Sequence, residues 1–375
     1  MGKLFLIIGT KGQYVKMAPV MLELDRRGIP YRLIHANQHP RITREISRTF
    51  GLREPDAELF SIDRDIATTA EAIRWLSRNL YGLITGNIAT HLGMNEGRKA
   101  GSNGDIMIIH GDAPPALLAL VAAKRFGLRV AHVESGERTH NLLQPFPEEI
   151  IRKLVDRFSD ILFAGSQAAL ANLRNEKVKG EVVDIGINTL LDAVRYVLNH
   201  QGGFSPHSEG EYALIYFHRF ESVNSYSRLK FLLDIINRGL GNERLLMILH
   251  DSTRHNLQRM GLLGSLQKLE ERGHLTILPL LPYHQFISLL SGARFLVTDG
   301  GGPQRESHLL GVPCLILREH VEQEGFENVC VAGFEREKMR GFLADPERFR
   351  IAGGVERFGH LQPSKAVVDR LEREI

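Results

Sequence analysis

The stretch HGDAPPALLALVAAKRFGLRVAHVESGERT, residues 110–139, contains the pattern that decides the fold. Its first residues close the apolar run DIMIIHGD, and RVAHVES is a second such run. Both are short, partly β-branched and end at turn residues, which is typical of buried strands. The intervening PPALLALVAAKRFG has helical spacing and ends at glycine, as helices often do. A strand, a helix and a second strand in this order predict two parallel strands.

The same alternation extends in both directions along the chain. Amphipathic segments such as APVMLELDRRG and EEIIRKLVDRFSD predict further helices. The expected fold class is therefore α/β, with parallel sheets covered by helices on both faces. The other runs that predict strands are KLFLIIGT, YRLIHAN, DILFAGS, VVDIGIN, YALIYFHR, RLLMILHD, LTILPLL, RFLVTDGGG and VPCLILRE.

A break in this alternation predicts the domain organisation. NHQGGFSPHSEGE, residues 199–211, is rich in Gly, Ser and His and suits a linker. We expect a Rossmann-like domain at residues 1–198, a second at 212–360, and a helix at 361–375 that packs back on the first domain. Two doubly wound domains that face each other would place the carboxyl ends of both sheets at a shared cleft, where ligands bind in such folds.

Composition narrows the class of protein. The net charge of +3, from 47 Lys and Arg against 44 Asp and Glu, is too small and too dispersed to indicate nucleic-acid binding. The two cysteines, Cys314 and Cys330, lack metal-ligand spacing and favour a reducing compartment. The opening MGKLFLIIGT is too short for a signal peptide or a membrane span. We therefore predict a cytoplasmic protein with no nucleic-acid and no membrane partner.

The turn GTKGQYVK, residues 9–16, is a candidate phosphate site after the opening strand. A glycine-containing turn that enters a helix offers backbone N–H groups, and Lys11 and Lys16 add positive charge. The alternative is an ordinary turn with two solvated lysines. The turn matches neither GxGxxG nor a Walker loop, so we expect no nicotinamide cofactor, and no His, Cys or Asp spacing indicates a metal.

TDGGGPQRES, residues 298–307, is a stronger candidate for anion binding. It follows an apolar strand and opens a helix, and three glycines would let a bulky anion approach the backbone. Glu306 lies further along the helix and could accept hydrogen bonds from ribose hydroxyls; the alternative is a tight turn with an exposed glutamate. The three glycines are Gly300, Gly301 and Gly302.

FHRFES, residues 217–222, places a cationic pair after the first strand of the second domain. His218 and Arg219 could both point at a diphosphate, and a histidine can change its charge near neutral pH. A structural role for a histidine at a strand end is the alternative.

Acidic residues follow the strands of the first domain. Asp112 and Glu134 each end an apolar run, and PFPEEIIR supplies Glu148 and Glu149 at a helix start. Asp112 could instead cap the helix that begins at Pro114, and the glutamate pair could simply favour the helix dipole. Glu134 has no such explanation. Acids that converge near a cleft raise one another's pKa values, which suits general acid and base chemistry.

These segments together resemble the UDP-N-acetylglucosamine 2-epimerase family, which has a glycosyltransferase-B-like architecture of two Rossmann-type domains. The resemblance covers nearly the whole chain. It rests on many ordered motifs, namely GTKGQYVKMAP against a pattern like GTRPEAIKMAP, then HGD, HVESGERT, PFPEEIIR, GINTLLDA, HRFES, DGGGPQRES and FGHLQPSKAVVDRL.

The resemblance implies a role for each candidate residue. The family's proton-handling acids fall on Asp112, Glu134 and Glu148. Its histidine near the diphosphate falls on His218, and its ribose-binding glutamate on Glu306. In the family reaction UDP leaves C1 while the C2 proton is removed, which gives a 2-acetamidoglucal, and UDP adds back after C2 is reprotonated on its other face. Which acid abstracts the proton is open at this point.

The remaining implied contacts are with phosphate or substrate. Lys11, Lys16, Arg219 and the three glycines are expected at the UDP, and the implied substrate contacts are Arg138 and Glu149. Family members are commonly dimers, so the resemblance also implies a homodimer.

The chain departs from the family pattern at several positions. Lys11 replaces an arginine and loses its bidentate fork. Gln13 replaces a glutamate, Gly300 a serine, and Gln323 an arginine, while NQHPRI only half resembles the QHREM of an allosteric substrate site. These changes indicate an altered substrate or regulation, with the acids kept.

The sequence is consistent with three alternative functions. The first is epimerisation of a UDP-2-acetamido sugar, with a hydrolysing variant that releases free sugar and UDP. The second is a glycosyltransferase of the same architecture that uses a nucleotide-sugar donor. The third is a non-catalytic nucleotide-sugar-binding protein, which the retained acids disfavour.

Overall fold

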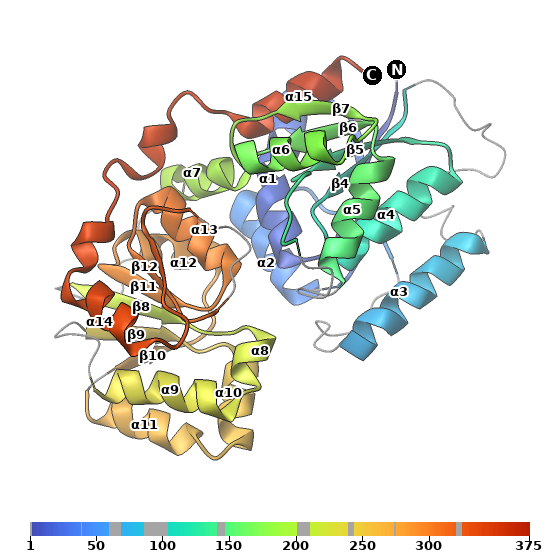
Figure 1. The fold of residues 1–375 in the computed structure, drawn as a ribbon. Coiled ribbons are helices and arrows are strands. Elements are labelled where there is room, and N and C mark those ends of the chain that lie inside the picture. The colour runs from blue at the N-terminus through green and yellow to red at the C-terminus, as the bar shows by residue number, and fades with distance from the viewer. Residues whose placement is uncertain are drawn as a thin grey trace. The chain divides into compact units, whose positions relative to one another are not determined.

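The chain divides into two compact units in a computed structural model (Figure 1). Unit 1 comprises Met1–Tyr196 and His360–Ile375, and unit 2 comprises Val197–Gly359. The structure describes residues 2–38, 40–59, 69–85, 104–140, 147–200, 211–238, 244–273, 275–319 and 325–375.

Unit 1 contains a seven-stranded parallel sheet in the order β3-β2-β1-β4-β5-β6-β7. Its strands are β1 Leu4–Ile8, β2 Tyr31–His35, β3 Ala57–Glu58, β4 Ile106–His110, β5 Arg129–Val133, β6 Ile161–Ala164 and β7 Glu181–Asp184. Its helices are α1 Lys11–Arg26, α2 Pro40–Phe50, α3 Thr69–Ile84, α4 Pro114–Arg125, α5 Glu148–Phe158, α6 Gln167–Asn175, α7 Leu190–His200 and α15 Pro363–Glu372. The boundary between the units falls within α7.

The two central strands explain the apolar runs in the sequence. Every residue of β1 and of β4 is buried, because helices cover both faces of the sheet. The helix α1 packs against α2 and α15, while α4 packs against α3 and α5. The strand order reverses between β1 and β4. Because crossover connections are right-handed, this reversal places the two groups of helices on opposite faces of the sheet.

The start of α1 differs from the sequence expectation. A helix was expected to begin near Ala18, whereas α1 begins at Lys11. Thr10 and Gln13 form a capping box: the Thr10 side chain accepts a hydrogen bond from Gln13 N, and the Gln13 side chain accepts one from Thr10 N. The turn that was expected to be open is therefore closed by its own side chains.

The C-terminal helix α15 belongs to unit 1, where it packs on α1. Val367, Val368 and Leu371 are completely buried. At the edge of this contact the Arg27 guanidinium lies 2.6 Å from Asp369 Oδ1 and 2.7 Å from Glu372 Oε2. The apolar face supplies most of the stabilisation, because exposed ion pairs contribute only ~0–1 kcal/mol each.

Unit 2 contains a six-stranded parallel sheet in the order β10-β9-β8-β11-β12-β13. Its strands are β8 Tyr212–Tyr216, β9 Arg244–Ile248, β10 Thr276–Leu278, β11 Phe295–Thr298, β12 Cys314–Ile316 and β13 Val329–Val331. Its helices are α8 Phe220–Val223, α9 Tyr226–Asn237, α10 Asp251–Arg259, α11 Leu263–Glu271, α12 Tyr283–Ser291, α13 Gly301–Leu310 and α14 Arg336–Ala344, followed by two 3-10 turns at Pro346–Phe349 and Gly354–Phe358.

Two strands were not expected from the sequence. β3 has two residues and β13 has three, so neither offers enough alternation to be recognised. Each lies at an edge of its sheet. The expected linker at 199–211 overlaps the end of α7 at its first two residues, and residues 201–210 lie outside the described part of the chain.

Replacing Leu371 by Ala tests the docking of α15. The variant should unfold unit 1 at lower urea concentration, because loss of a buried leucine costs about 2–5 kcal/mol. The only tryptophan of the chain, Trp75, is buried in α3, so its fluorescence reports on unit 1 alone. Glu372→Ala removes an exposed ion-pair partner and should change the midpoint far less. Equal midpoint shifts in the two variants would contradict the dominance of the apolar face.

Candidate functional site

The carboxyl ends of β1, β4 and β5 bring the candidate residues of unit 1 together. The strand order reverses between β1 and β4, so their helices leave toward opposite faces and the loops separate. The loop after β1 leads into α1 with its two lysines, the loop after β4 carries Asp112, and the residue after β5 is Glu134. This is the usual ligand position in an open parallel sheet.

Glu134 is held between two basic side chains. Lys16 Nζ lies 2.5 Å from Glu134 Oε1 and 2.6 Å from Oε2, and His110 Nε2 lies 3.2 Å from Oε2. The Glu134 side chain is only 9% exposed, so the partners offset the cost of burying its charge. Gly111 lies opposite, with φ 61°, and a Cβ there would make an ordinary contact at 3.5 Å with Glu134 Oε2.

The backbone of Glu134 adopts the left-handed region, with φ 67°. This conformation is uncommon outside glycine and costs roughly 1–3 kcal/mol. The surrounding contacts must therefore determine it, and such strain is concentrated at functional sites.

The two lysines of the first turn have different surroundings. Lys16 is paired with Glu134, so its charge is directed at a carboxylate of unit 1. Lys11 is the first residue of α1. Gln13 donates from Nε2 to His110 O at 3.0 Å, which ties the start of α1 to the end of β4. The predicted contacts of Lys11 and Lys16 with phosphate stay predictions.

Asp112 contacts α5. Its carboxylate forms an ion pair with Arg152, whose guanidinium also lies 3.3 Å from Glu149 Oε2. The capping alternative for Asp112 is wrong, because Ala113 is the N-cap of α4 and no side chain caps that helix. About a quarter of the Asp112 side chain remains exposed.

The two glutamates at the start of α5 differ in burial. Glu148 is the first residue of the helix and is partly exposed. Glu149 is completely buried, and its Oε2 accepts hydrogen bonds from Thr139 N at 3.0 Å and Thr139 Oγ1 at 3.2 Å. Glu149 therefore fixes the end of the loop that carries Glu134, and its predicted contact with substrate stays untested.

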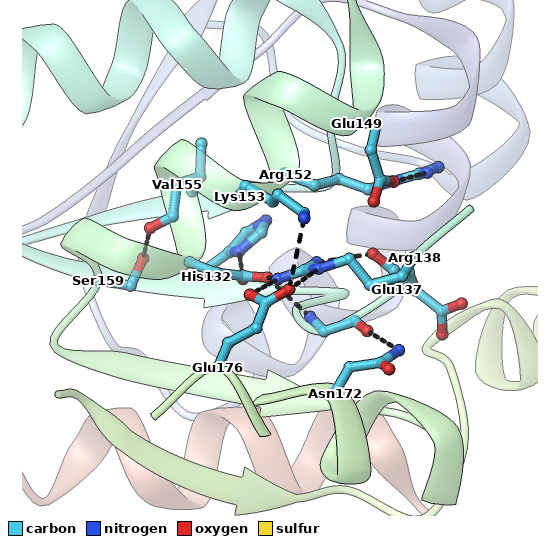
Figure 2. A network of polar contacts seen from close by, with 12 residues as sticks. His132, Glu137, Arg138, Glu149, Arg152, Lys153, Val155, Ser159, Asn172 and Glu176 are labelled. Atoms are coloured by element: carbon cyan, nitrogen blue, oxygen red, sulfur yellow. Dashed lines mark hydrogen bonds and ion pairs between the residues drawn. The ribbon is translucent and has the colours of Figure 1, made fainter. Parts of the chain in front are cut away.

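A polar network joins His132, Arg138 and Glu176 (Figure 2), and the buried carboxylate of Asp156 connects the first two of them. Asp156 Oδ1 lies 2.7 Å from His132 Nδ1, and Asp156 Oδ2 accepts hydrogen bonds from Gly136 N at 3.1 Å and from Arg138 at 2.7 Å. His132 Nε2 lies 3.0 Å from Gly111 O. The two ring nitrogens of His132 therefore face one acceptor oxygen each.

Burial alone would raise the pKa of Asp156, but the charges and hydrogen bonds of His132 and Arg138 outweigh burial and lower it. Arg138 also makes two hydrogen bonds to Glu176, at 2.8 and 2.7 Å. Its side chain is almost completely buried. The structure thus gives Arg138 a place inside unit 1, and its predicted role as a substrate contact stays a prediction.

Asp299 organises the corresponding place in unit 2, where the strand order reverses between β8 and β11. Its completely buried carboxylate accepts hydrogen bonds from the backbone N–H groups of His218 and Arg219, both at 3.0 Å. Burial raises the pKa of Asp299, against the opposing effect of these hydrogen bonds. The His218 ring stacks on Tyr216 with centroids 4.4 Å apart. Asp299 therefore sets the position of both predicted cationic residues.

The glycine turn precedes α13, whose first residue is Gly301. Gly300 is the N-cap of this helix, and no side chain caps it. A Cβ on Gly300 would lie 2.6 Å from His218 Cε1, so glycine is what admits the histidine ring. A Cβ on Gly302 would meet no protein atom within 4 Å. Gly300, at the N-terminus of α13, therefore lies beside the His218 ring, and a helix N-terminus offers backbone N–H groups that can bind an anion.

Glu306 lies in the middle of α13 and is largely buried. Tyr283 of α12 lies close to it: burial, and then the charge of the nearby Glu306, raises the pKa of that tyrosine. The alternative of an exposed glutamate is wrong. The predicted contact of Glu306 with ribose stays a prediction.

Sequence reasoning did not assign Asp156, His132, His110, Asp299 or Tyr283 to the site. Asp156 lies in a segment that reads as an ordinary amphipathic helix, so nothing local marks it as buried. Asp299 had a usable signal, because an acid between a buried strand and three glycines has no room to face water.

Some sequence predictions fall outside the described residues, namely Gln323, His39 of NQHPRI, and Pro145 and Phe146 of PFPEEIIR. Among the residues that the structure describes, no group of three or more His, Cys, Asp or Glu could hold a metal ion. No helix in the described part of the chain is long and apolar enough to cross a membrane.

Comparison with known proteins identifies relatives over most of the chain. A family model described as UDP-N-acetylglucosamine 2-epimerase matches residues 22–341. The UDP-N-acetylglucosamine 2-epimerase of Methanococcus maripaludis is 28% identical over 335 residues, 86% of this chain and 85% of that protein. The UDP-2,3-diacetamido-2,3-dideoxy-D-glucuronate 2-epimerase of Pseudomonas aeruginosa is 25% identical over 327 residues, 85% of this chain and 84% of that protein.

Solved structures show the same fold. The UDP-GlcNAc 2-epimerase of Methanocaldococcus jannaschii, in complex with UDP-GlcNAc and UDP, superposes with a TM-score of 0.76 at 24% identity and covers 99% of both chains. This likeness confirms the predicted fold class of two Rossmann-like, glycosyltransferase-B-like domains. Together with the match of the family model, it shows that this chain belongs to the UDP-N-acetylglucosamine 2-epimerase family of isomerases.

Proposed function

We propose that this chain inverts C2 of a UDP-2-acetamido sugar by eliminating and re-adding UDP. The observation that carries the proposal is Glu134, a buried carboxylate held by Lys16 and His110 at the strand-order reversal of unit 1. A structural ion pair would not require the strained backbone of Glu134.

The reaction places specific demands on these groups. As the C1–O bond breaks, UDP leaves with the electron pair of that bond, and a base removes the C2 proton so that its electrons form the C1–C2 double bond. The reverse steps return a proton to the other face of C2 and UDP to C1. Two carboxyl groups can serve the two faces, and Asp112, Glu134 and Glu148 are the candidates.

Unit 2 supplies the groups that suit a nucleoside diphosphate. His218 and Arg219 follow β8, the N-terminus of α13 offers backbone N–H groups, and Glu306 is the predicted ribose contact. Stabilisation of the departing UDP anion lowers the barrier to C1–O cleavage. The proposal therefore assigns proton transfer to unit 1 and the retention of UDP to unit 2.

The sugar is the open element of the proposal. Relatives of similar identity are named for N-acetylglucosamine and for a diacetamido glucuronate, and both are UDP-2-acetamido sugars. The shared part is the UDP and the acetamido group at C2, so the proposal commits to that class.

We also propose a cellular location and an oligomeric state. We expect it in the cytoplasm, where two free thiols, Cys314 and Cys330, remain reduced. We expect a homodimer, which the exposed side chains of Ile150, Leu154 and Phe158 on one face of α5 support.

Incubation of the protein with UDP-GlcNAc and with UDP-2,3-diacetamido-2,3-dideoxy-glucuronate in D2O tests the reaction. NMR should show the C2 epimer of at least one, with deuterium at C2. Glu134→Gln should reduce the rate by about 10²–10⁴-fold, because a carboxamide cannot accept the proton.

Other products of that incubation identify the competing reactions. Free ManNAc plus UDP indicates hydrolysis, and UDP release that depends on an added acceptor indicates glycosyl transfer. Absence of any reaction with either sugar, or an unchanged rate in Glu134→Gln, would contradict the proposal.

Gly300→Ala tests the diphosphate site. The new methyl group would collide with the His218 ring, so the ring must move, and we expect about a tenfold weaker Kd for UDP by calorimetry, equivalent to ~1.4 kcal/mol. Gly341→Ala in α14 is the matched control, since its Cβ meets no atom within 4 Å, and it should bind UDP normally. Unchanged affinity in Gly300→Ala would speak against His218 as a contact of UDP.

Sedimentation equilibrium tests the assembly. The wild-type protein should have about twice the chain mass of 42.2 kDa. Leu154→Lys should yield monomers, whereas Tyr226→Lys, at an exposed aromatic of α9, should not. A wild-type mass of one chain would refute the dimer.

A further inference from the structure

We propose that Asp156 is a positioning residue that holds Glu134 in its left-handed conformation by fixing the chain on both sides of it. The inference rests on the proposed function, since it concerns the same acid. Asp156 lies in α5, and nothing in its local sequence connects it with Glu134.

The two carboxylate oxygens of Asp156 contact the chain on both sides of Glu134, and we call these contacts, with His132 and with Gly136, the bracket. One oxygen contacts His132, two residues before Glu134, and the other accepts a hydrogen bond from the N–H of Gly136, two residues after it. Neither contact alone restricts the peptide planes on both sides of Glu134. Both together fix the ends of the short segment within which the backbone must turn.

The chain after Glu134 is held from a second direction. Gly136 has φ 80°, and a Cβ there would lie 2.5 Å from Ala169 O. Asn172 Nδ2 donates to Gly136 O at 2.9 Å. The segment is thus pressed against α6, and the Gly136 N–H is directed at Asp156.

His132 extends the effect to the neighbouring loop. Its Nε2 lies 3.0 Å from Gly111 O, and Gly111 is the residue that faces the Glu134 carboxylate and precedes Asp112. The buried carboxylate of Asp156 therefore links, through His132, the loop that carries Asp112 to the loop that carries Glu134. The result is a Glu134 side chain that reaches Lys16 with both oxygens.

Arg138 balances the negative charge of Asp156, and its second partner, Glu176, offers a matched control. It donates to Asp156 on its buried side and to Glu176, whose side chain is 34% exposed, on the other. Glu176 thus shares the same arginine but makes no contact with His132 or Gly136 among the described hydrogen bonds. If a variant of Asp156 acted only by destabilising the protein through Arg138, variants of Glu176 would show the same effect. If it acts through the contacts with His132 and Gly136, variants of Glu176 should not show that effect.

The test compares Asp156→Asn with Glu176→Gln. Asparagine has one acceptor oxygen, so its NH2 faces either the Gly136 N–H, which loses its acceptor, or His132 Nδ1, which must then be unprotonated; in both cases one side loses its hydrogen bond to a carboxylate. We expect kcat for the UDP-2-acetamido sugar to fall about 10–100-fold in Asp156→Asn with KM and the Kd for UDP changed less than threefold, because a displaced acid affects the proton-transfer step. Glu176→Gln should retain the wild-type kcat.

A crystal structure of Asp156→Asn gives a readout that needs no turnover. Glu134 should leave the left-handed region, and its carboxylate should separate from Lys16 Nζ. If Asp156→Asn does not fold, His132→Gln, which removes one side of the bracket, should show the same fall in kcat and the same displacement.

Three outcomes would overturn the inference: an unchanged kcat in Asp156→Asn, equal losses in Asp156→Asn and Glu176→Gln, or a variant structure with Glu134 still left-handed and in contact with Lys16. If the wild-type protein converts no UDP-2-acetamido sugar, the proposed function fails instead. The crystal structure then still decides whether Asp156 positions Glu134.

Discussion

Parallel pairing of β1 with β4, at the point where the strand order reverses, is the constraint on which the rest of unit 1 depends. Right-handed crossovers carry the helices after these strands to opposite faces, so their loops separate and leave room for side chains at the sheet edge. Unit 2 repeats the arrangement between β8 and β11. In each unit the candidate residues follow these strands or their neighbours, although they are far apart in the sequence.

Each unit then holds a buried acid by different means. Asp156 faces the cationic Arg138 and the His132 ring, and its pKa is lowered, so it contributes stability above the ordinary carboxyl pKa that is lost as the pH falls through the lowered value. Asp299 relies on backbone N–H groups, and burial raises its pKa. The first arrangement maintains a charged carboxylate beside the Glu134 loop, whereas the second orients the backbone of His218 and Arg219, with the His218 ring nitrogen Nδ1 at the longer distance of 3.6 Å from Asp299 Oδ1.

Two departures from the family pattern have packing explanations. Gln13 closes the cap of α1 with its oxygen and donates to the end of β4 with its nitrogen, which a carboxylate cannot do. Gly300 permits the position that the His218 ring has in this structure, since a Cβ would lie 2.6 Å from its Cε1. Neither change therefore needs to be explained by an altered contact with phosphate. Any difference in substrate is better tested by varying the sugar.

The two α/β units, most strands, and the acids and glycines at strand ends could be predicted from the sequence, because hydrophobic runs and turn residues are local signals. The sequence also indicated the family through ordered motifs. It did not show β3 and β13, which are too short, or the start of α1, which depends on a side-chain cap. The folded chain was needed to see that Lys16 faces Glu134, that Arg138 and Glu149 are buried within unit 1, and that Asp156 contacts the residues on both sides of Glu134. These contacts join residues up to 118 positions apart, and the direction of a side chain across a sheet edge follows from packing that no local pattern encodes.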